Sequence, residues 1–212
     1  MKALALVAVA MMLVVPAALA DCSFNYGWED GYTYLTIYQP DYAYGYNVGA
    51  PDPVHTGLRS LKLVDNTDPL RATPDVYICW IVGLTDGDQV TASIWRYDTT
   101  PGGSPSARIW AKYTPVGGDV DSYAGSASGN SDYGPGTGWD QTSYTWTFDS
   151  NSDARDGLGI AIRTYSNAGD TVWVDDLEVF IDSDTFCGQV YLPCNPVPVE
   201  AASWAQVKAL YR

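Results

Sequence analysis

Short runs rich in Val, Ile, Thr, Tyr and Trp recur along most of the chain, and clusters of Gly, Pro, Asn and Asp separate them. Helical periodicity is almost absent between Cys22 and Asp182, so the pattern predicts an all-β sandwich or barrel. The expected strands are residues 32–38, 60–64, 76–84, 89–97, 107–113, 143–148, 158–165 and 171–181. Two long segments without a period, 40–53 and 116–139, are expected to be surface loops, either mere connections or places where a site is built.

The first 20 residues have the pattern of a removable export signal: Lys2, an apolar run over 3–18, and a small-residue cleavage site ending at Ala20. We therefore expect a secreted protein, either extracellular or held at the cell surface. Residues 21–182 are expected to form one domain, and 183–198 a linker containing cysteine and proline. Residues 199–212 have the spacing of a short amphipathic helix, which would dock on its own domain or serve in sorting, attachment or self-association.

The chain is strongly acidic, with 25 Asp and Glu against 11 Lys and Arg and a formal net charge of −14 at pH 7. This balance argues against nucleic acid, whose phosphates attract Lys and Arg, and against an anionic membrane surface. After the export signal no apolar run is long enough to cross a bilayer as a helix. The 16 Tyr and 8 Trp far outnumber the 4 Phe, and such amphipathic rings suit wet binding surfaces.

Four cysteines, Cys22, Cys79, Cys187 and Cys194, would enter an oxidising compartment, where disulfides are the default expectation. Three connectivities are possible, and we favour Cys187 with Cys194 because the two are close in sequence. A zinc site is not expected, since no CxxC motif or neighbouring His completes four ligands.

Alternation along the predicted strands sorts their side chains onto two faces. If these strands are neighbours, one outward sheet face carries aromatic rings among cations. Its members would be Trp95, Tyr97, Arg108, Trp110, Arg163 and Tyr165, with Lys112 beside them. Such a face suits a sugar, because a pyranose stacks its apolar C–H face on a ring while its hydroxyls bond charged neighbours. The alternative is that loops or the C-terminal helix cover these rings and make them a second small core. By contrast, Tyr144, Trp146 and Phe148 alternate with small polar residues and are expected in the main core.

Two acidic pairs stand out, Glu29-Asp30 near the beginning and Asp175-Asp176 near the end. The second pair lies within a predicted strand, so its charges must be solvated, paired or metal-bound. Calcium is the cation that suits carboxylate and carbonyl oxygens in an exported acidic protein. Solvated turns are the alternative interpretation.

Five motifs follow one another in the chain: residues 25–31 (Asn-Tyr-Gly-Trp-Glu-Asp-Gly), 55–63, 87–95, Gly138-Trp139 before 144–148, and 172–179. In this order they resemble the jelly-roll carbohydrate-binding modules of the family 4, 9, 16 and 22 kind, which are galactose-binding-like β-sandwiches. The resemblance covers about residues 23–180. The chain departs from it at Val90, where family members often carry an aromatic residue.

The resemblance implies a two-sheet antiparallel jelly roll in which the first and last strands are neighbours. It also implies a structural calcium ion near the chain ends. By position, its ligands would be Glu29, backbone carbonyls around Gly57, and Asp175.

Catalysis is not expected from this chain. His55 is the only histidine, so a Ser-His-Asp or Cys-His arrangement has one weakly placed base at most. No phosphate-binding loop or metalloprotease motif is present. We therefore predict a non-catalytic protein that binds polysaccharide through exposed Trp and Tyr. The alternative is a structural or adhesive surface protein that uses the same scaffold for protein contacts or assembly.

Overall fold

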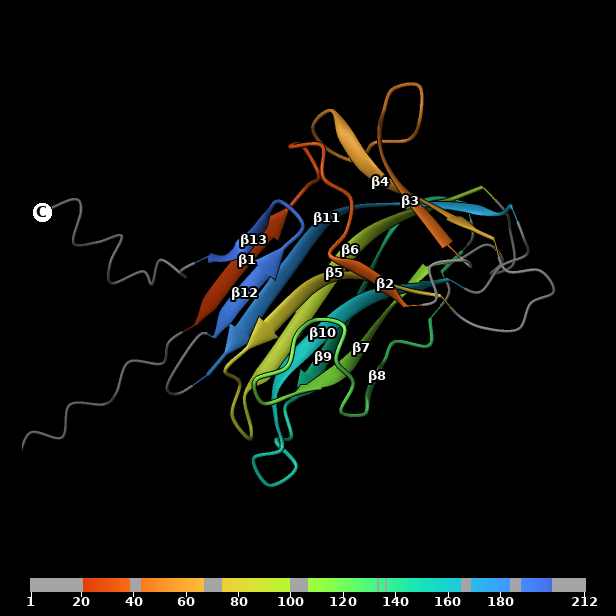
Figure 1. Cartoon of the computed structure of the whole chain (residues 1–212). Coiled ribbons are helices and arrows are strands. Elements are labelled where there is room, and N and C mark those ends of the chain that lie inside the picture. The colour runs from red at the N-terminus through yellow and green to blue at the C-terminus, as the bar shows by residue number, and fades with distance from the viewer. Residues whose placement is uncertain are drawn as a thin grey trace, which may run out of the picture.

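A computed structural model of the chain describes residues 21–38, 43–66, 74–99, 107–132, 134–135, 137–164, 169–183 and 188–199. Regular structure in these ranges consists of β-strands (Figure 1). The strands are β1 (Cys22–Tyr26), β2 (Thr36–Tyr38), β3 (Ala43–Gly49), β4 (Arg59–Asp65), β5 (Asp75–Val82), β6 (Gln89–Asp98), β7 (Ala107–Pro115), β8 (Ser126–Gly129), β9 (Gly138–Thr147), β10 (Arg155–Thr164), β11 (Thr171–Asp182), β12 (Gln189–Leu192) and β13 (Asn195–Val199). The predicted export signal and C-terminal helix lie outside the described residues, apart from Val199, and both stay predictions.

The strands form two antiparallel sheets. Sheet A has the order β3-β4-β11-β6-β9, with β1 pairing β11 as well. Sheet B has the order β13-β12-β5-β10-β7-β8, with β2 pairing β5. The expected two-sheet antiparallel β-sandwich is confirmed, and its first strand lies beside β11 as the resemblance implied.

The core lies between the inner faces of the two sheets. Sheet A contributes alternate residues of β6 and β11, among them Val90, Ile94 and Val174, and sheet B contributes Ile109 and Ile160. Trp146 and Phe148 are also buried, and Tyr144 packs against them at the edge of this core. The predicted inward face of each of these strands is therefore correct. In the part of the chain that is described, no helix is long and apolar enough to cross a membrane.

Three of the sequence expectations about segments are wrong. Strand β3 occupies most of the segment 40–53, and β8 lies within 116–139, so neither segment is only a loop. Strand β12 pairs with β5 and buries Val190, so this part of the expected linker belongs to sheet B. The stack of Tyr191 on Trp80, with ring centroids 4.8 Å apart, adds to the docking of β12.

The cysteines do not pair as expected. Cys79 and Cys194 carry free thiols, so the favoured bond between Cys187 and Cys194 is wrong. Cys22 is disulfide-bonded, and its partner sulfur lies outside the described residues. Burial raises the pKa of the Cys79 thiol well above its usual range, which keeps this core cysteine protonated.

A candidate ligand-binding cleft on sheet B

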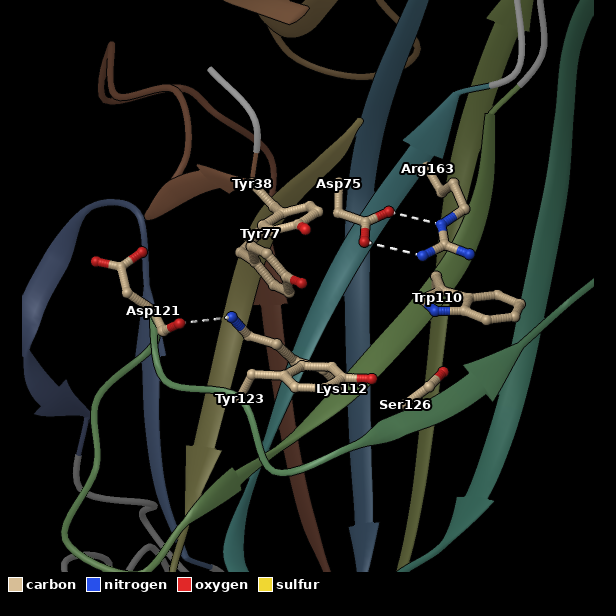
Figure 2. A pocket seen from close by; sticks show the side chains of 9 residues that line it. All are labelled: Tyr38, Asp75, Tyr77, Trp110, Lys112, Asp121, Tyr123, Ser126 and Arg163. Carbon is tan, nitrogen blue, oxygen red and sulfur yellow. Dashed lines mark hydrogen bonds and ion pairs between the residues drawn. The ribbon is translucent and has the colours of Figure 1, made fainter. Parts of the chain in front are cut away.

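A cleft of about 360 Å³ lies on the outer face of sheet B, the face turned away from the core (Figure 2). Strands β2, β5, β7, β8 and β10 and the loop before β8 contribute its lining. The lining residues are Tyr38, Asp75, Tyr77, Trp110, Lys112, Asp121, Tyr123, Ser126 and Arg163. A hollow that combines aromatic rings with a few charged groups is the usual form of a small-ligand or sugar site.

The hollow has a simple origin in the strand register. Ala161 on β10 lies opposite Tyr77 on β5 and opposite Trp110 on β7. A small residue thus stands between two large rings. Gly159, two residues before Ala161 on β10, has the same effect, because a side chain there would meet the Tyr77 ring and the Lys112 stem. The row is large, small, large, and this difference in side-chain size opens the floor of the cleft.

Arg163 is the best-anchored group on this floor. Its guanidinium donates two bonds to the Asp75 carboxylate, from Nε to Oδ1 at 2.6 Å and from Nη2 to Oδ2 at 2.9 Å. The same guanidinium lies 4.0 Å from the centre of the Trp110 ring, and that of Arg108 lies 4.9 Å from it. A bidentate pair that is also stacked on an indole holds both planar groups in one orientation.

Lys112 forms a second polar point of the cleft. Its ammonium lies 4.2 Å from the centre of the Tyr77 ring and donates a hydrogen bond to the Asp121 carbonyl at 3.2 Å. Burial lowers the pKa of Lys112 below its ordinary value, although the charges of Asp121, Asp75 and Asp119 oppose this shift. Burial, together with the Asp75 charge, raises the pKa of the Tyr77 hydroxyl well above its usual range. Tyr77 therefore stays a neutral hydrogen-bonding group.

Two tyrosines stand at the rim. Tyr38 is 56% exposed and Tyr123 is 68% exposed, so both rings are open to a ligand. Figure 2 shows Tyr38 and Tyr77 on one side of the cleft and Trp110 on the other. The loop that carries Tyr123 is fixed at Asp121, whose carboxylate accepts a 2.6 Å hydrogen bond from the Thr36 hydroxyl.

The predicted aromatic face is divided between the two sheets. Trp95 and Tyr97 lie on β6 in sheet A, whereas Arg108 and Trp110 lie on β7 and Arg163 lies on β10, both in sheet B. All of these side chains point away from the core as expected. The prediction of one shared face is nevertheless wrong, because β6 pairs with β11 and β9 while β7 pairs with β10 and β8. Tyr165 lies outside the described residues.

On the outer face of sheet A the rings are covered, as the alternative interpretation expected. The His55 ring stacks on Trp95 with centroids 3.9 Å apart and planes 16° apart. Tyr97 packs edge-on against Trp139 and Trp173. The Trp173 indole donates a hydrogen bond to Asp52 at 3.0 Å, so the loop 50–58 is held down over the sheet at both places. A second hollow of about 430 Å³ lies beside Trp95, but the imidazole already occupies that indole face.

The three residues predicted to bind calcium gather around one loop. The Glu29 carboxylate accepts hydrogen bonds from the backbone of Leu58 and Arg59, and it lies against Gly57, where any side chain would clash. Asp175 Oδ2 accepts bonds from the backbone of His55 and Thr56 at 3.0 and 3.3 Å. Asp175 has no exposed surface, and its burial raises its pKa to about 6.

A β-bulge explains how Asp175 reaches this loop. The pairing of β11 with β6 shifts register between Asp175 and Glu178, and Asp176 adopts a positive φ of 46°. The neighbouring Asp176 carboxylate then bonds the His55 ring at 2.6 Å and the Thr56 hydroxyl at 2.6 Å. The described residues contain no cluster of three His, Cys, Asp or Glu side chains able to hold a metal. A cation here would therefore use Glu29, Asp175 and backbone carbonyls, a set of hard oxygen donors that fits calcium chemically.

Sequence reasoning missed most of the residues that line the cleft. The residues not identified as site residues are Tyr38, Asp75, Tyr77, Asp121, Tyr123 and Ser126. A signal for two of them was present, because Asp75 and Tyr77 are polar-tipped residues at alternate positions of an otherwise apolar strand. No comparable pattern marks Tyr123 in its loop.

Comparison with known proteins supports the fold. The chain is similar to the CBM22-1 xylan-binding domain of Xyn10C from Paenibacillus barcinonensis, with a TM-score of 0.54 and 12% identity over 79% of this chain and 99% of that domain. It is similar also to the CBM22-1-CBM22-2 tandem domain of the same protein, with a TM-score of 0.54 and 13% identity over 80% of this chain and 49% of that one. No protein-family model and no curated protein matches the chain. The predicted jelly-roll fold of a carbohydrate-binding module is confirmed, and at such low identity the likeness shows the fold alone.

Proposed function

We propose that this protein is a non-catalytic carbohydrate-binding protein that holds a polysaccharide chain in the cleft on sheet B. The observation that carries the proposal is the combination of exposed Tyr38 and Tyr123 with Trp110 around one hollow that also contains charged groups. Aromatic rings offer apolar faces to pyranose C–H groups, and fixed polar groups bond the hydroxyls. The similar domain of known structure is described as xylan-binding, so xylan is the first glycan to test.

The chemistry of the floor also favours binding over catalysis. Hydrolysis of a glycoside requires two carboxyl groups that face each other across the sugar. In the cleft, Asp75 is engaged by both Arg163 nitrogens, and the Asp121 carboxylate is bonded to Thr36. Because Asp75 is held in this way, the described lining offers only the Asp121 carboxylate, and one carboxylate is not the pair that hydrolysis needs.

We further propose a structural calcium ion at the loop 50–58, bound by Glu29, Asp175 and carbonyl oxygens near Gly57. The support for it is that both carboxylates converge on this loop, Glu29 from the turn after β1 and Asp175 from β11. The ion would compensate the buried Asp175 charge and fasten the loop that covers Trp95. Export from the cell, based on the first 20 residues, completes the proposal.

The proposal is tested by removing rings one at a time and measuring affinity for soluble xylan and other polysaccharides by calorimetry and gel retardation. Tyr123→Ala and Trp110→Ala are each expected to weaken binding by about 2- to 10-fold, since a stacked ring contributes about 0.5–1.5 kcal/mol beyond its buried area. Tyr46→Ala is the matched control, because Tyr46 is 51% exposed but lies on β3 of sheet A.

Equal affinities of wild type and both cleft variants, with folding intact, would exclude the cleft as the binding site. Failure of the wild type to bind any glycan, together with defined oligomers in light scattering, would favour the structural or adhesive alternative instead.

A further inference from the structure

Lys112 is a buried cation without a salt-bridge partner among the described residues. Its residue surface is only 5% exposed, and its ammonium has one hydrogen bond, to the neutral carbonyl of Asp121. The Tyr77 ring face supplies a further weak attraction at 4.2 Å. A buried charge with so little compensation is costly, so an anion entering the cleft would find a favourable partner.

The carboxylates nearest to Lys112 each accept hydrogen bonds from other groups. Asp75 accepts both bonds of Arg163, and the Asp121 carboxylate accepts the Thr36 hydroxyl. Asp119 accepts bonds from the backbone of Asp121 and from Ser122 in its own loop. None of the three forms an ion pair with Lys112, although their charges act on it through space. Since Arg163 is neutralised by Asp75, Lys112 is the cation of the lining that lacks a counter-charge.

We propose that the cleft prefers a polysaccharide bearing isolated carboxylate sugars, such as uronic acid side groups, and that the Lys112 ammonium binds the carboxylate. This inference rests on the proposed function, because it names the class of glycan that the same cleft takes. The sugar rings would stack at the aromatic side chains while the carboxylate reaches the ammonium beneath them.

The charge of the whole protein limits the proposal to sparse carboxylates. The formal net charge is −14, so a polyuronate carrying a charge on every sugar would be repelled over its length. A largely neutral backbone with occasional acidic side groups avoids this repulsion and still supplies one carboxylate to one ammonium. Short-range contact with Lys112 is screened by salt much less than the long-range repulsion is.

The test compares one glycan in two forms: a xylan carrying glucuronic acid side groups and the same polymer after chemical reduction of its carboxyls to alcohols. Wild type is expected to bind the acidic form on the order of tenfold more tightly, the usual effect of one hydrogen bond to a charged group. Lys112→Met keeps the apolar stem of the side chain and is expected to lose the preference, so that it binds the acidic and the reduced form with equal affinity. Lys62→Met is the matched control, because the Lys62 ammonium lies 5.3 Å from the centre of the Trp173 ring on the outer face of sheet A, away from the cleft.

Each outcome bears on a different statement. Equal binding of both forms by wild type overturns the carboxylate preference and leaves the proposed function standing. A preference that persists in Lys112→Met overturns the role of this lysine. Binding of neither form overturns the proposed function as well. Should Lys112→Met not fold, competition on wild type decides: free glucuronate is expected to displace the acidic xylan more effectively than free glucose does, and equal displacement by the two sugars overturns the inference.

Discussion

The ion pair between Arg163 and Asp75 determines the geometry of the cleft floor, and its contribution to the stability of the fold can be measured. The two side chains are 18% and 7% exposed, and two hydrogen bonds of 2.6 and 2.9 Å join them. Arg163→Met retains most of the apolar stem but leaves the Asp75 carboxylate without its partner. Breaking a fully buried pair costs about 3–5 kcal/mol. Because the Arg163 side chain retains some exposure, water can partly solvate the abandoned carboxylate. We therefore expect Arg163→Met to lower the free energy of unfolding by about 2–4 kcal/mol.

A double-mutant cycle separates the cost of the abandoned charge from the loss of packing. Asp75→Asn removes the charge with almost no change of shape. The double variant Arg163→Met/Asp75→Asn contains no buried unpaired carboxylate, so it is expected to be more stable than Arg163→Met alone. The coupling between the two positions should be about 1.5–3 kcal/mol, the usual contribution of hydrogen bonds to charged groups.

Urea unfolding followed by tryptophan fluorescence gives these free energies, provided that the denaturant slope stays constant. Arg59→Met is the control, because Arg59 is exposed and bonds Asn47 at 2.8 Å, and it should change the stability by less than about 0.5 kcal/mol. If Arg163→Met is as stable as wild type, or if the stability losses of the two substitutions simply add, the Arg163–Asp75 pair does not organise the floor of the cleft and the reasoning fails.

Two further predictions concern the calcium site and Lys112. A chelator is expected to lower the melting temperature by on the order of 5–10 °C, because an ion at a hundred times its dissociation constant stabilises by about 2.7 kcal/mol. Added calcium should restore it, Glu29→Gln should not respond, and an unchanged melting temperature at saturating chelator would remove the ion from the proposal. For Lys112, burial lowers the pKa in the folded state below 10.5, so between these two pKa values the unfolded chain binds more protons than the folded one. The free energy of unfolding of wild type relative to Lys112→Met should therefore rise as the pH is raised from neutrality toward 10.5, and a flat difference would contradict it.

Side-chain alternation predicted correctly which residues of each strand face outward. Val90, Ala92 and Ile94 are buried, whereas Trp95 and Trp110 point away from the core. The same pattern could not say which sheet a strand joins, since that depends on partners far away in the sequence. Strand β6 pairs with residues more than 75 positions later in β11, such as Trp173 beside Tyr97. Long-range pairing of this kind leaves no trace in local periodicity.

Strand β3 shows how packing overrides local propensity. Its sequence, AYGYNVG, contains three small or flexible residues and resembles a loop. In the structure Gly45 lies under the Tyr34 ring, where a Cβ would approach the ring carbons to 2.6 and 2.7 Å. The glycine is therefore required by a contact with a residue outside the strand. Strand propensity reflects such neighbours more than the backbone itself, so composition alone misjudged this segment.

The contrast between the two outer faces explains why one of them is open and the other is not. Across sheet A, one register row places large side chains side by side: Tyr46, Lys62, Trp173, Tyr97 and Trp139. Large neighbours pack edge-on and fill the surface, and the loop 50–58 then closes over them through Asp52 and His55. Across sheet B, the corresponding row is interrupted by Ala161 between Tyr77 and Trp110, and the same kinds of ring leave a hollow. The position of a single small residue in the register, rather than the number of aromatic residues, thus determines which face can accept a ligand.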